Sequence, residues 1–249
     1  MQQIDWNKTL IHCSSLSKLF TEPQAKAAKE AGELSATAKT HLIETYIREK
    51  YGRYREVETK QMRKGTNAEG DSLLLLSEHL GEYLEKNQEK VYNSHIIGTP
   101  DAYLGENINQ AEQIFDVKSS YDIFTFLANA SGELNKDYYY QIQGYLWLSG
   151  AELGYIAYCL VDLPQDQLEY EKMALIRKLG AISEESPEFI KEWKKKENLF
   201  LYSDIDESER ILLFKVEKDP DFPEKCAAKV SKARQFLFEF EQKHLNFNK

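Results

Sequence analysis

The segment that most constrains the fold is Tyr155–Val161, a run in which every residue is apolar or aromatic and none is charged. A strand of this kind has no face suited to water, so it has to lie inside a sheet that is covered on both sides. Helical patterns surround it; Ile43, Tyr46 and Ile47, for example, fall on one side of a predicted helix over residues 34–50. The sequence therefore predicts an α/β fold in which helices flank the sheet.

The remaining elements follow in the order helices, β-meander, helices and a further strand. The pattern predicts further helices over residues 66–80, 121–129, 137–149, 167–179, 187–198 and 222–244, and strands over residues 88–92, 95–104, 110–118, 154–161 and 210–217. No repeat or Pro/Gly/Ser-rich linker divides the chain. We therefore expect one domain over residues 1–249, with a core at about 34–161 and a C-terminal extension at about 162–249.

The three cysteines, Cys13, Cys159 and Cys226, are far apart and form no CxxC pair. This pattern predicts reduced thiols in a cytoplasmic protein, with no zinc or iron–sulfur site. No stretch approaches the roughly 18–20 apolar residues that cross a bilayer, and residues 1–10 lack the basic and apolar runs of a signal peptide. We therefore expect no membrane partner.

Two carboxylates are predicted to lie across one hairpin. Asp101 and Asp116 fall in neighbouring strand candidates that are joined by a turn at Gly105-Glu106-Asn107. Cross-strand neighbours have Cβ atoms roughly 4.5–5.5 Å apart, where like charges destabilise the sheet. A divalent cation between the two carboxylates would remove the repulsion. Lys118 lies two residues beyond Asp116 on the same strand face and can reach the same point.

Glu69 is a third candidate ligand. It extends the apolar stripe of Leu73, Leu76 and Leu80, which should face the sheet. A buried carboxylate needs a cation, a hydrogen-bond network or solvent, since burying it alone costs several kcal/mol. The alternative is an exposed Glu69 in the first turn of its helix, stabilised by the helix dipole.

The predicted helix over residues 137–149 carries two pairs at i, i+4 spacing: Gln141 with Tyr145, and Gln143 with Trp147. The aromatic members suit a core, and a glutamine on a helix usually faces solvent. A functional glutamine here would position a phosphate or an attacking water.

The formal net charge of −9 argues mildly against a nucleic-acid partner, because neutralising phosphates usually requires a basic surface. Residues 48–64, however, carry seven basic and three acidic side chains, a local balance of +4. Arg53, Arg55, Arg63 and Lys64 are the candidate phosphate contacts in this segment. The alternative is a set of solvated helix faces.

Ser14 and Ser15 precede an apparent helix near the N-terminus. Hydroxyls and free backbone N–H groups at a helix start form a phosphate site. The alternative is that one serine serves only as an N-cap, which is its commonest use before a helix.

Four motifs occur in order along the chain: Lys64-Gly65-Thr66-Asn67-Ala68-Glu69, Gly98-Thr99-Pro100-Asp101, Asp116-Val117-Lys118 and Gln141-Ile142-Gln143-Gly144-Tyr145. Their order and spacing resemble the lambda-exonuclease-like (YqaJ-type) viral recombination nucleases of the PD-(D/E)XK superfamily. The resemblance begins at the serine motif, Ile11-His12-Cys13-Ser14-Ser15-Leu16, and runs to about Val161, whereas the C-terminal third fits loosely. It implies a restriction-endonuclease-like core with a central mixed β-sheet flanked by helices.

The resemblance also implies roles for the candidate residues. Glu69, Asp101 and Asp116 would bind one or two Mg²⁺ or Mn²⁺ ions, with the backbone carbonyl of Val117 as a further ligand. Lys118 would orient the attacking water or help to deprotonate it. The last motif completes the set: Gln141 or Gln143 would support the water and the scissile phosphate, and Tyr145 belongs to the same helical group.

Two positions depart from the family pattern. Asp116 stands where the lambda enzyme itself has a glutamate, and the superfamily accepts either acid. The arginine expected before the serine motif has no clear counterpart, and Lys8 is the nearest basic residue.

The function implied is an exonuclease that degrades one strand of linear duplex DNA from an end, in the 5′→3′ direction, and supplies single strands to an annealing protein. The resemblance further implies a homo-oligomer, a ring trimer, in a bacterial host cell or encoded by a prophage. One alternative is a structure-specific or restriction-type endonuclease on the same fold; only the serine motif and the glutamine-rich helix favour the exonuclease. Another is a non-catalytic DNA-binding protein, against which the intact set of three acids and a lysine argues.

Overall fold

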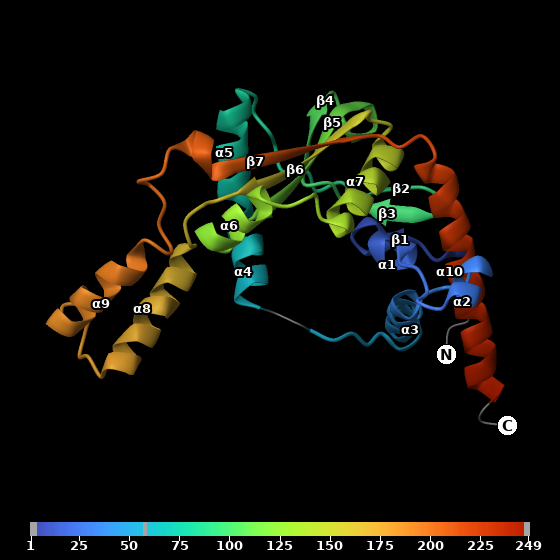
Figure 1. The fold of residues 1–249 in the computed structure, drawn as a ribbon, viewed down its shortest axis with the longest axis horizontal. Coiled ribbons are helices and arrows are strands. Elements are labelled where there is room, and N and C mark those ends of the chain that lie inside the picture. Colours follow the sequence, from blue (N-terminus) through green and yellow to red (C-terminus); the bar gives the residue numbers. More distant parts are fainter. Residues whose placement is uncertain (1–3, 57–58, 247–249) are drawn as a thin grey trace.

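The computed structural model describes residues 4–56 and 59–246 (Figure 1). Its central sheet has four strands, β4 (Ala102–Gly105), β5 (Ala111–Ser119), β6 (Leu153–Cys159) and β7 (Ile211–Glu217), in the order β4-β5-β6-β7. β5 and β6 are parallel, whereas β4 and β7 each pair antiparallel with their neighbour. The predicted mixed central sheet is confirmed.

A second, smaller sheet lies beside the first. It consists of β1 (Ile11–His12), β3 (Ile96–Gly98) and β2 (Val91–Tyr92), in the order β1-β3-β2. β1 pairs parallel with β3, so that His12 lies opposite Ile97. This pairing joins the serine motif to the segment that leads into Asp101.

Helices lie on both faces of the central sheet and extend to both ends of the molecule. They are α1 (Leu16–Phe20), α2 (Lys26–Glu30), α3 (Ala36–Tyr51), α4 (Lys60–Asn67), α5 (Glu69–Leu80), α6 (Ile123–Ala130), α7 (Lys136–Ser149), α8 (Gln165–Leu179), α9 (Pro187–Glu197) and α10 (Phe222–Asn246). The α8–α9 hairpin projects at one end of the molecule, and α3 and α10 lie at the other (Figure 1). None of the described helices is long and apolar enough to span a membrane.

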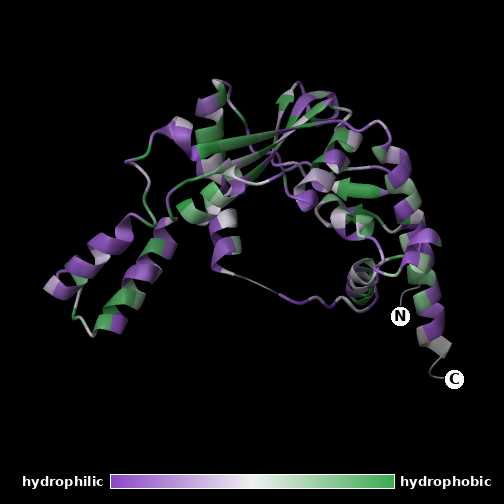
Figure 2. Ribbon diagram, in the orientation of Figure 1, coloured by the Kyte–Doolittle hydropathy of each residue, from purple (hydrophilic) through white to green (hydrophobic). Residues whose placement is uncertain are grey.

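Strand β6 is buried on both faces, as its sequence predicts. Ile156 and Tyr158 belong to the hydrophobic cluster that includes residues of α7, whereas Ala157 and Cys159 belong to the cluster that includes residues of α5. Hydrophobic residues accordingly follow the strands in Figure 2, while α9 is mainly hydrophilic on the visible side. The two clusters hold α5 and α7 against opposite faces of the sheet, with β5 between them.

Two predicted elements are divided in the structure. The strand expected over residues 95–104 is split at residues 99–101, so that β3 and β4 belong to different sheets. Pro100 explains the break, because it has no N–H for the ladder. The helix expected over residues 66–80 begins earlier and is divided at Ala68, whose φ of −98° and ψ of 5° are not helical. Glu69 is therefore the first residue of α5 rather than part of a continuous helix.

Candidate active site

The centre of the candidate site is the pair Asp101 and Asp116. Ala102 pairs with Phe115 across β4 and β5, which brings Asp101, the residue before β4, beside Asp116. Asp116 is completely buried. The backbone N–H of Val117 donates to Oδ2 of Asp101 at 2.7 Å. The predicted meeting of these two acids across the hairpin is thus confirmed.

The electrostatics of the pair follow from burial and like charge. Burial, with the Asp116 charge as the next cause, raises the pKa of Asp101 to about 7. Burial also raises the pKa of Asp116. One oxygen of Asp116, Oδ2, is buried without a hydrogen bond of good geometry. The pair therefore carries negative charge that its surroundings do not fully compensate, and a hard divalent cation would do so.

Lys118 supplies the one cation that touches the pair among the described residues. Its Nζ lies 2.6 Å from Oδ2 of Asp116 and 4.9 Å from the centre of the Tyr138 ring. Burial disfavours the charged ammonium, but Asp116 and Asp101 outweigh it and raise the pKa of Lys118. As placed, Lys118 is a cation that can stabilise negative charge at this point.

Glu69 lines the same cleft, but its carboxylate is turned elsewhere. Nζ of Lys86 donates to Oε2 of Glu69 at 2.8 Å, and the Glu69 side chain is 22% exposed. Within residues 4–56 and 59–246, no group of three His, Cys, Asp or Glu side chains is arranged to hold a metal ion. Asp101 and Asp116 thus form a two-carboxylate core, and Glu69 has to leave Lys86 to join it.

The two candidate glutamines on α7, Gln141 and Gln143, have different partners. Nε2 of Gln141 donates to Oδ1 of Asp116 at 2.8 Å and to the hydroxyl of Tyr145 at 2.9 Å. Gln141 and Tyr145 therefore belong to the site. The prediction that Gln143 supports the reacting groups does not fit the structure, because both ends of its amide bind the turn between β7 and α10.

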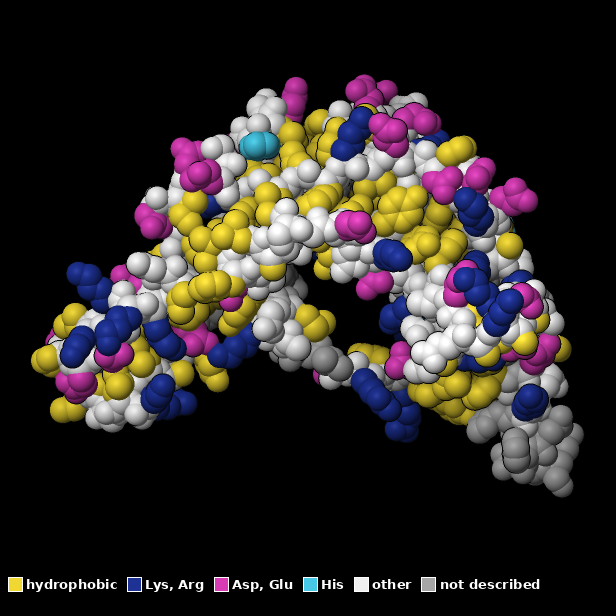
Figure 3. Space-filling model, in the orientation of Figure 1, with side chains coloured by type: hydrophobic (Ala, Val, Ile, Leu, Met, Phe, Trp, Pro, Cys, Tyr) yellow, Lys and Arg dark blue, Asp and Glu magenta, His cyan; other side chains and the backbone are white. Residues whose placement is uncertain are grey.

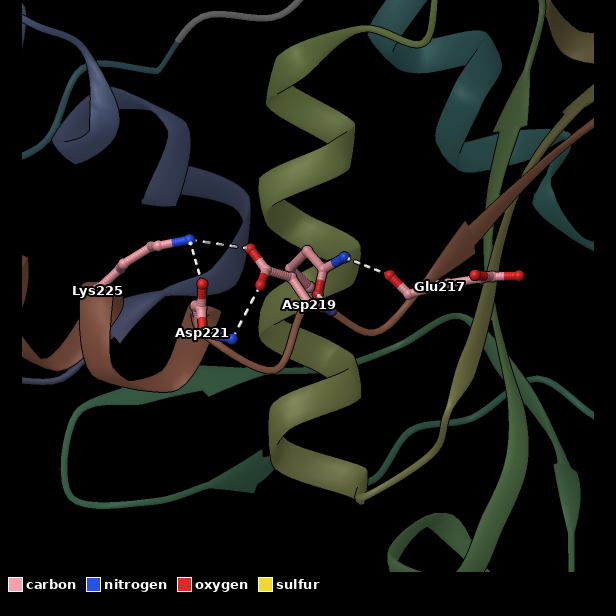
Figure 4. Close-up of polar contacts among 5 residues, drawn as sticks. Glu217, Asp219, Asp221 and Lys225 are labelled. Atoms are coloured by element: carbon pink, nitrogen blue, oxygen red, sulfur yellow. Dashed lines mark hydrogen bonds and ion pairs between the residues drawn. The ribbon is translucent and has the colours of Figure 1, made fainter.

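In that turn, Gln143 donates to the carbonyl of Glu217 at 2.7 Å and accepts from the N–H of Asp219 at 3.0 Å. Figure 4 shows the turn, in which Lys225 lies beside Asp219 and Asp221 at the start of α10. Gln143 thus has a structural role that fixes α7 against α10.

A cleft of about 620 Å³ opens above the buried acids. Glu69, Asp101, Val117 and Lys118 line it, as do Tyr138 and Tyr158. Its opposite wall comes from α4, through Gln61, Met62, Gly65 and Thr66. Asp116 lies beneath the floor of this cleft, where its carboxylate contacts Lys118 and Gln141.

A smaller cavity of about 220 Å³ lies at β1 and β3. Its lining includes Ser14, His12, Lys90, Thr99 and Tyr145. Ser14 is exposed in this cavity, whereas Ser15 is half-buried, is absent from the lining and makes no side-chain cap bond to α1. Sequence reasoning missed Lys90, since only the pairing of β1 with β3 brings the serine motif to this place.

The basic candidates differ in exposure. Arg53 and Arg55 are exposed on the segment after α3, where Figure 3 shows Lys and Arg side chains. Arg63 is exposed on α4 and pairs with Asp166 at 2.8 Å. Lys64 is completely buried and donates to backbone carbonyls of Tyr121 and Val161. The prediction that Lys64 contacts a phosphate therefore does not fit the structure.

Neither a protein-family model nor a curated protein matches this sequence. Solved structures do. A phage-related exonuclease from Haemophilus somnus 129PT matches with a TM-score of 0.70 and 26% identity, over 95% of this chain and 97% of that one. The alkaline exonuclease LHK-Exo from Laribacter hongkongensis matches with a TM-score of 0.60 and 13% identity, over 98% and 96%.

A second LHK-Exo structure, in complex with dAMP, matches with a TM-score of 0.61 and 13% identity, over 96% of this chain and 92% of that one. At this identity the two LHK-Exo structures show a shared fold alone, and the Haemophilus protein adds similarity of sequence along nearly the whole chain. These matches agree with the resemblance that the order of the four motifs indicates. The chain therefore has the PD-(D/E)XK nuclease fold of these exonucleases and resembles the lambda-exonuclease-like proteins.

Proposed function

We propose that this protein is a metal-dependent DNA exonuclease that hydrolyses linear duplex DNA from an end in the 5′→3′ direction. The observation that carries the proposal is the pair of half-buried Asp101 and buried Asp116 at a cleft of about 620 Å³, with Lys118 and Gln141 bound to Asp116. The exonuclease neighbours support a nuclease.

The donor set fits Mg²⁺ or Mn²⁺, in one or two ions. Both cations prefer carboxylate and carbonyl oxygens, and the paired acids offer Oδ2 of Asp116, a buried oxygen whose one close partner is the Lys118 ammonium. Asp101 and Asp116 would hold the ion, Glu69 would join them from α5, and the carbonyl of Val117 would be a further ligand. Such an ion supplies an activated water and offsets the charge of the phosphodiester transition state.

The surrounding side chains orient the acids of this centre. Gln141 holds the Asp116 carboxylate, and the Tyr145 hydroxyl holds Gln141 through the same amide nitrogen. The Lys118 ammonium faces the cleft beside Asp116, where it stabilises negative charge that develops on phosphate oxygens. The buried carboxylates thus position the groups that the cleft presents to DNA.

The assay that tests this function compares end-labelled linear duplex with closed circular duplex, in Mg²⁺ and in EDTA. We expect digestion of the linear duplex in Mg²⁺ alone, with labelled mononucleotides as products and intact circles. Equal digestion of circles identifies an endonuclease, and no digestion of either DNA identifies a binding protein; both results contradict the proposal.

End recognition is assigned to the cavity that contains Ser14 and Lys90. An ammonium and a hydroxyl lining one small cavity suit a terminal phosphate. Lys90→Gln and Ser14→Ala should slow digestion of 5′-phosphorylated duplex more than that of 5′-hydroxyl duplex. Lys26→Gln, on a helix that does not line this cavity, should slow neither. Equal slowing of both substrates would mean that the cavity does not read the phosphate.

Partners and location are part of the same proposal. The protein would act on double-stranded DNA as a homo-oligomer, a ring trimer, and would pass single strands to an annealing protein. It would do so in the cytoplasm of a bacterial host as a phage or prophage product. Light scattering of the purified protein tests the trimer directly.

A further inference from the structure

Lys64 is a buried lysine without a carboxylate partner. Its Nζ donates to the carbonyl of Tyr121 at 3.1 Å and to that of Val161 at 2.7 Å. The same atom lies 5.5 Å from the centre of the Tyr202 ring. None of the ion pairs found among the described residues includes Lys64.

This burial opposes stability. It lowers the pKa of Lys64 to about 8, and the more distant charges of Asp162 and Asp122 offset the effect only in part. A buried charge without a partner is costly, and an apolar side chain of the same size would avoid that cost. The ammonium therefore needs an explanation other than stability of the fold.

The two carbonyls that it binds are the informative feature. Tyr121 and Val161 each follow, by two residues, the last residue of a central parallel strand, β5 or β6. Lys64 thus joins α4 to the carboxyl ends of the two strands at the centre of the sheet. Tyr121 itself lines the cleft above the acids.

Helix α4 is the wall of that cleft, and it leads through Ala68 directly into Glu69. Any movement of α4 away from the strand ends therefore changes the position of Glu69 relative to Asp101 and Asp116. Tyr202, in the segment after α9, is a further contact of the ammonium, because its ring faces Lys64.

We infer that Lys64 is a positioning residue, which holds α4 against the ends of β5 and β6. It thereby fixes the start of α5, from which the Glu69 carboxylate can turn from Lys86 to the metal ion. The inference rests on the proposed function. Lys64 itself contacts neither DNA nor the ion. Residues that orient metal ligands from behind commonly change metal affinity by about 10–100-fold when replaced.

The test measures Mn²⁺ binding by calorimetry without DNA, thermal unfolding, and kcat on linear duplex. Lys64→Met should weaken Mn²⁺ binding by about 10-fold and lower kcat, while Tm stays equal or rises. The matched control is Lys50→Met, a buried lysine that is paired with Glu241. It should lower Tm and leave Mn²⁺ binding unchanged.

A second pair of variants decides the matter if Lys64→Met does not fold. Tyr202→Phe keeps the ring over the ammonium, and Tyr202→Leu removes it; only the leucine variant should weaken Mn²⁺ binding. Unchanged Mn²⁺ affinity and kcat in Lys64→Met, or losses that merely follow a fall in Tm, would overturn the inference. Absence of Mn²⁺ binding in the wild-type protein contradicts the proposed function instead, so the two failures are distinguishable.

Discussion

Two buried groups of charged side chains in this molecule differ in how their charge is balanced. In one, Glu241 of α10 accepts hydrogen bonds from Lys50 of α3 at 2.5 Å and from Trp6 at 2.7 Å. In the other, Asp101 and Asp116 share Lys118, and one Asp116 oxygen remains without a hydrogen bond of good geometry. The first group has one acid and one lysine, and the second has two acids and one lysine.

The difference appears in the pKa values of the acids. Burial acts to raise the pKa of Glu241, but hydrogen bonds from Lys50 and Trp6 prevail and lower it. Burial raises the pKa of Asp101 and Asp116 with no comparable compensation. Glu241 and Lys50, one acid and one lysine, are the balanced group, which joins α3 to α10. Asp101, Asp116 and Lys118, two acids and one lysine, are the unbalanced group, where a cation and a phosphate can be stabilised.

The largest expected effect is on catalysis. Asp116→Asn and Asp101→Asn should each abolish hydrolysis of linear duplex in Mg²⁺, because each removes a metal ligand that stabilises the transition state by several kcal/mol. Both variants should remain folded, since they remove a charge that the fold does not compensate. Near wild-type cleavage by either variant, measured by release of labelled nucleotide, would contradict the role given to that acid.

The next effect concerns the balanced group. Glu241→Gln leaves the Lys50 ammonium buried without its partner, so it should lower the free energy of unfolding by about 2 kcal/mol. Below the melting range its kcat should equal that of the wild type. Chemical denaturation with activity assays checks both values, and a loss of kcat in the folded variant would remove the distinction between the two groups.

A smaller effect is the pH dependence of the metal-free protein. The pKa of Asp101 is about 7 in the fold against 3.8 for the unperturbed group. The folded state therefore holds the proton more tightly, and this contribution to stability is lost as pH rises from about 4 to about 7. In EDTA, Asp101→Asn should flatten the fall of Tm over that window, as calorimetry at several pH values can show. An unaltered slope would mean that Asp101 titrates normally.

The smallest effect expected is on DNA binding by the exposed arginines after α3. Replacing Arg53 and Arg55 together with glutamine should reduce the slope of log binding constant against log salt by about two, one for each phosphate that the protein no longer neutralises. The control is Arg177→Gln on the outlying helix α8. The same slope in the double variant and in the wild type would place these arginines outside the DNA path.

The part of the site that could be predicted from the sequence is the part that one hairpin determines. The distance between Asp101 and Asp116 depends on a single turn, and the position of Lys118 depends on the two-residue period of the same strand. Gln141 is a candidate because it lies on α7, the second helix after the hairpin. These relations are local, so residue spacing carries them.

The contacts that residue spacing did not predict involve partners that are distant in sequence. Gln143 binds Glu217 and Asp219 in the turn before α10, and Glu69 binds Lys86. Lys64 is buried because α4 packs against the ends of β5 and β6, where its ammonium meets the carbonyls of Tyr121 and Val161 only after the chain has folded. Spacing along the chain cannot reveal such pairings, because they depend on packing of separate elements.

Calorimetric titration with Mn²⁺ tests the central claim most directly, which is that the unbalanced acids hold a metal ion and the balanced acid does not. The wild-type protein and Glu241→Gln should bind Mn²⁺ with the same affinity, and Asp116→Asn should show no binding. Equal binding by Asp116→Asn and the wild type, or no binding by the wild type, would contradict the account.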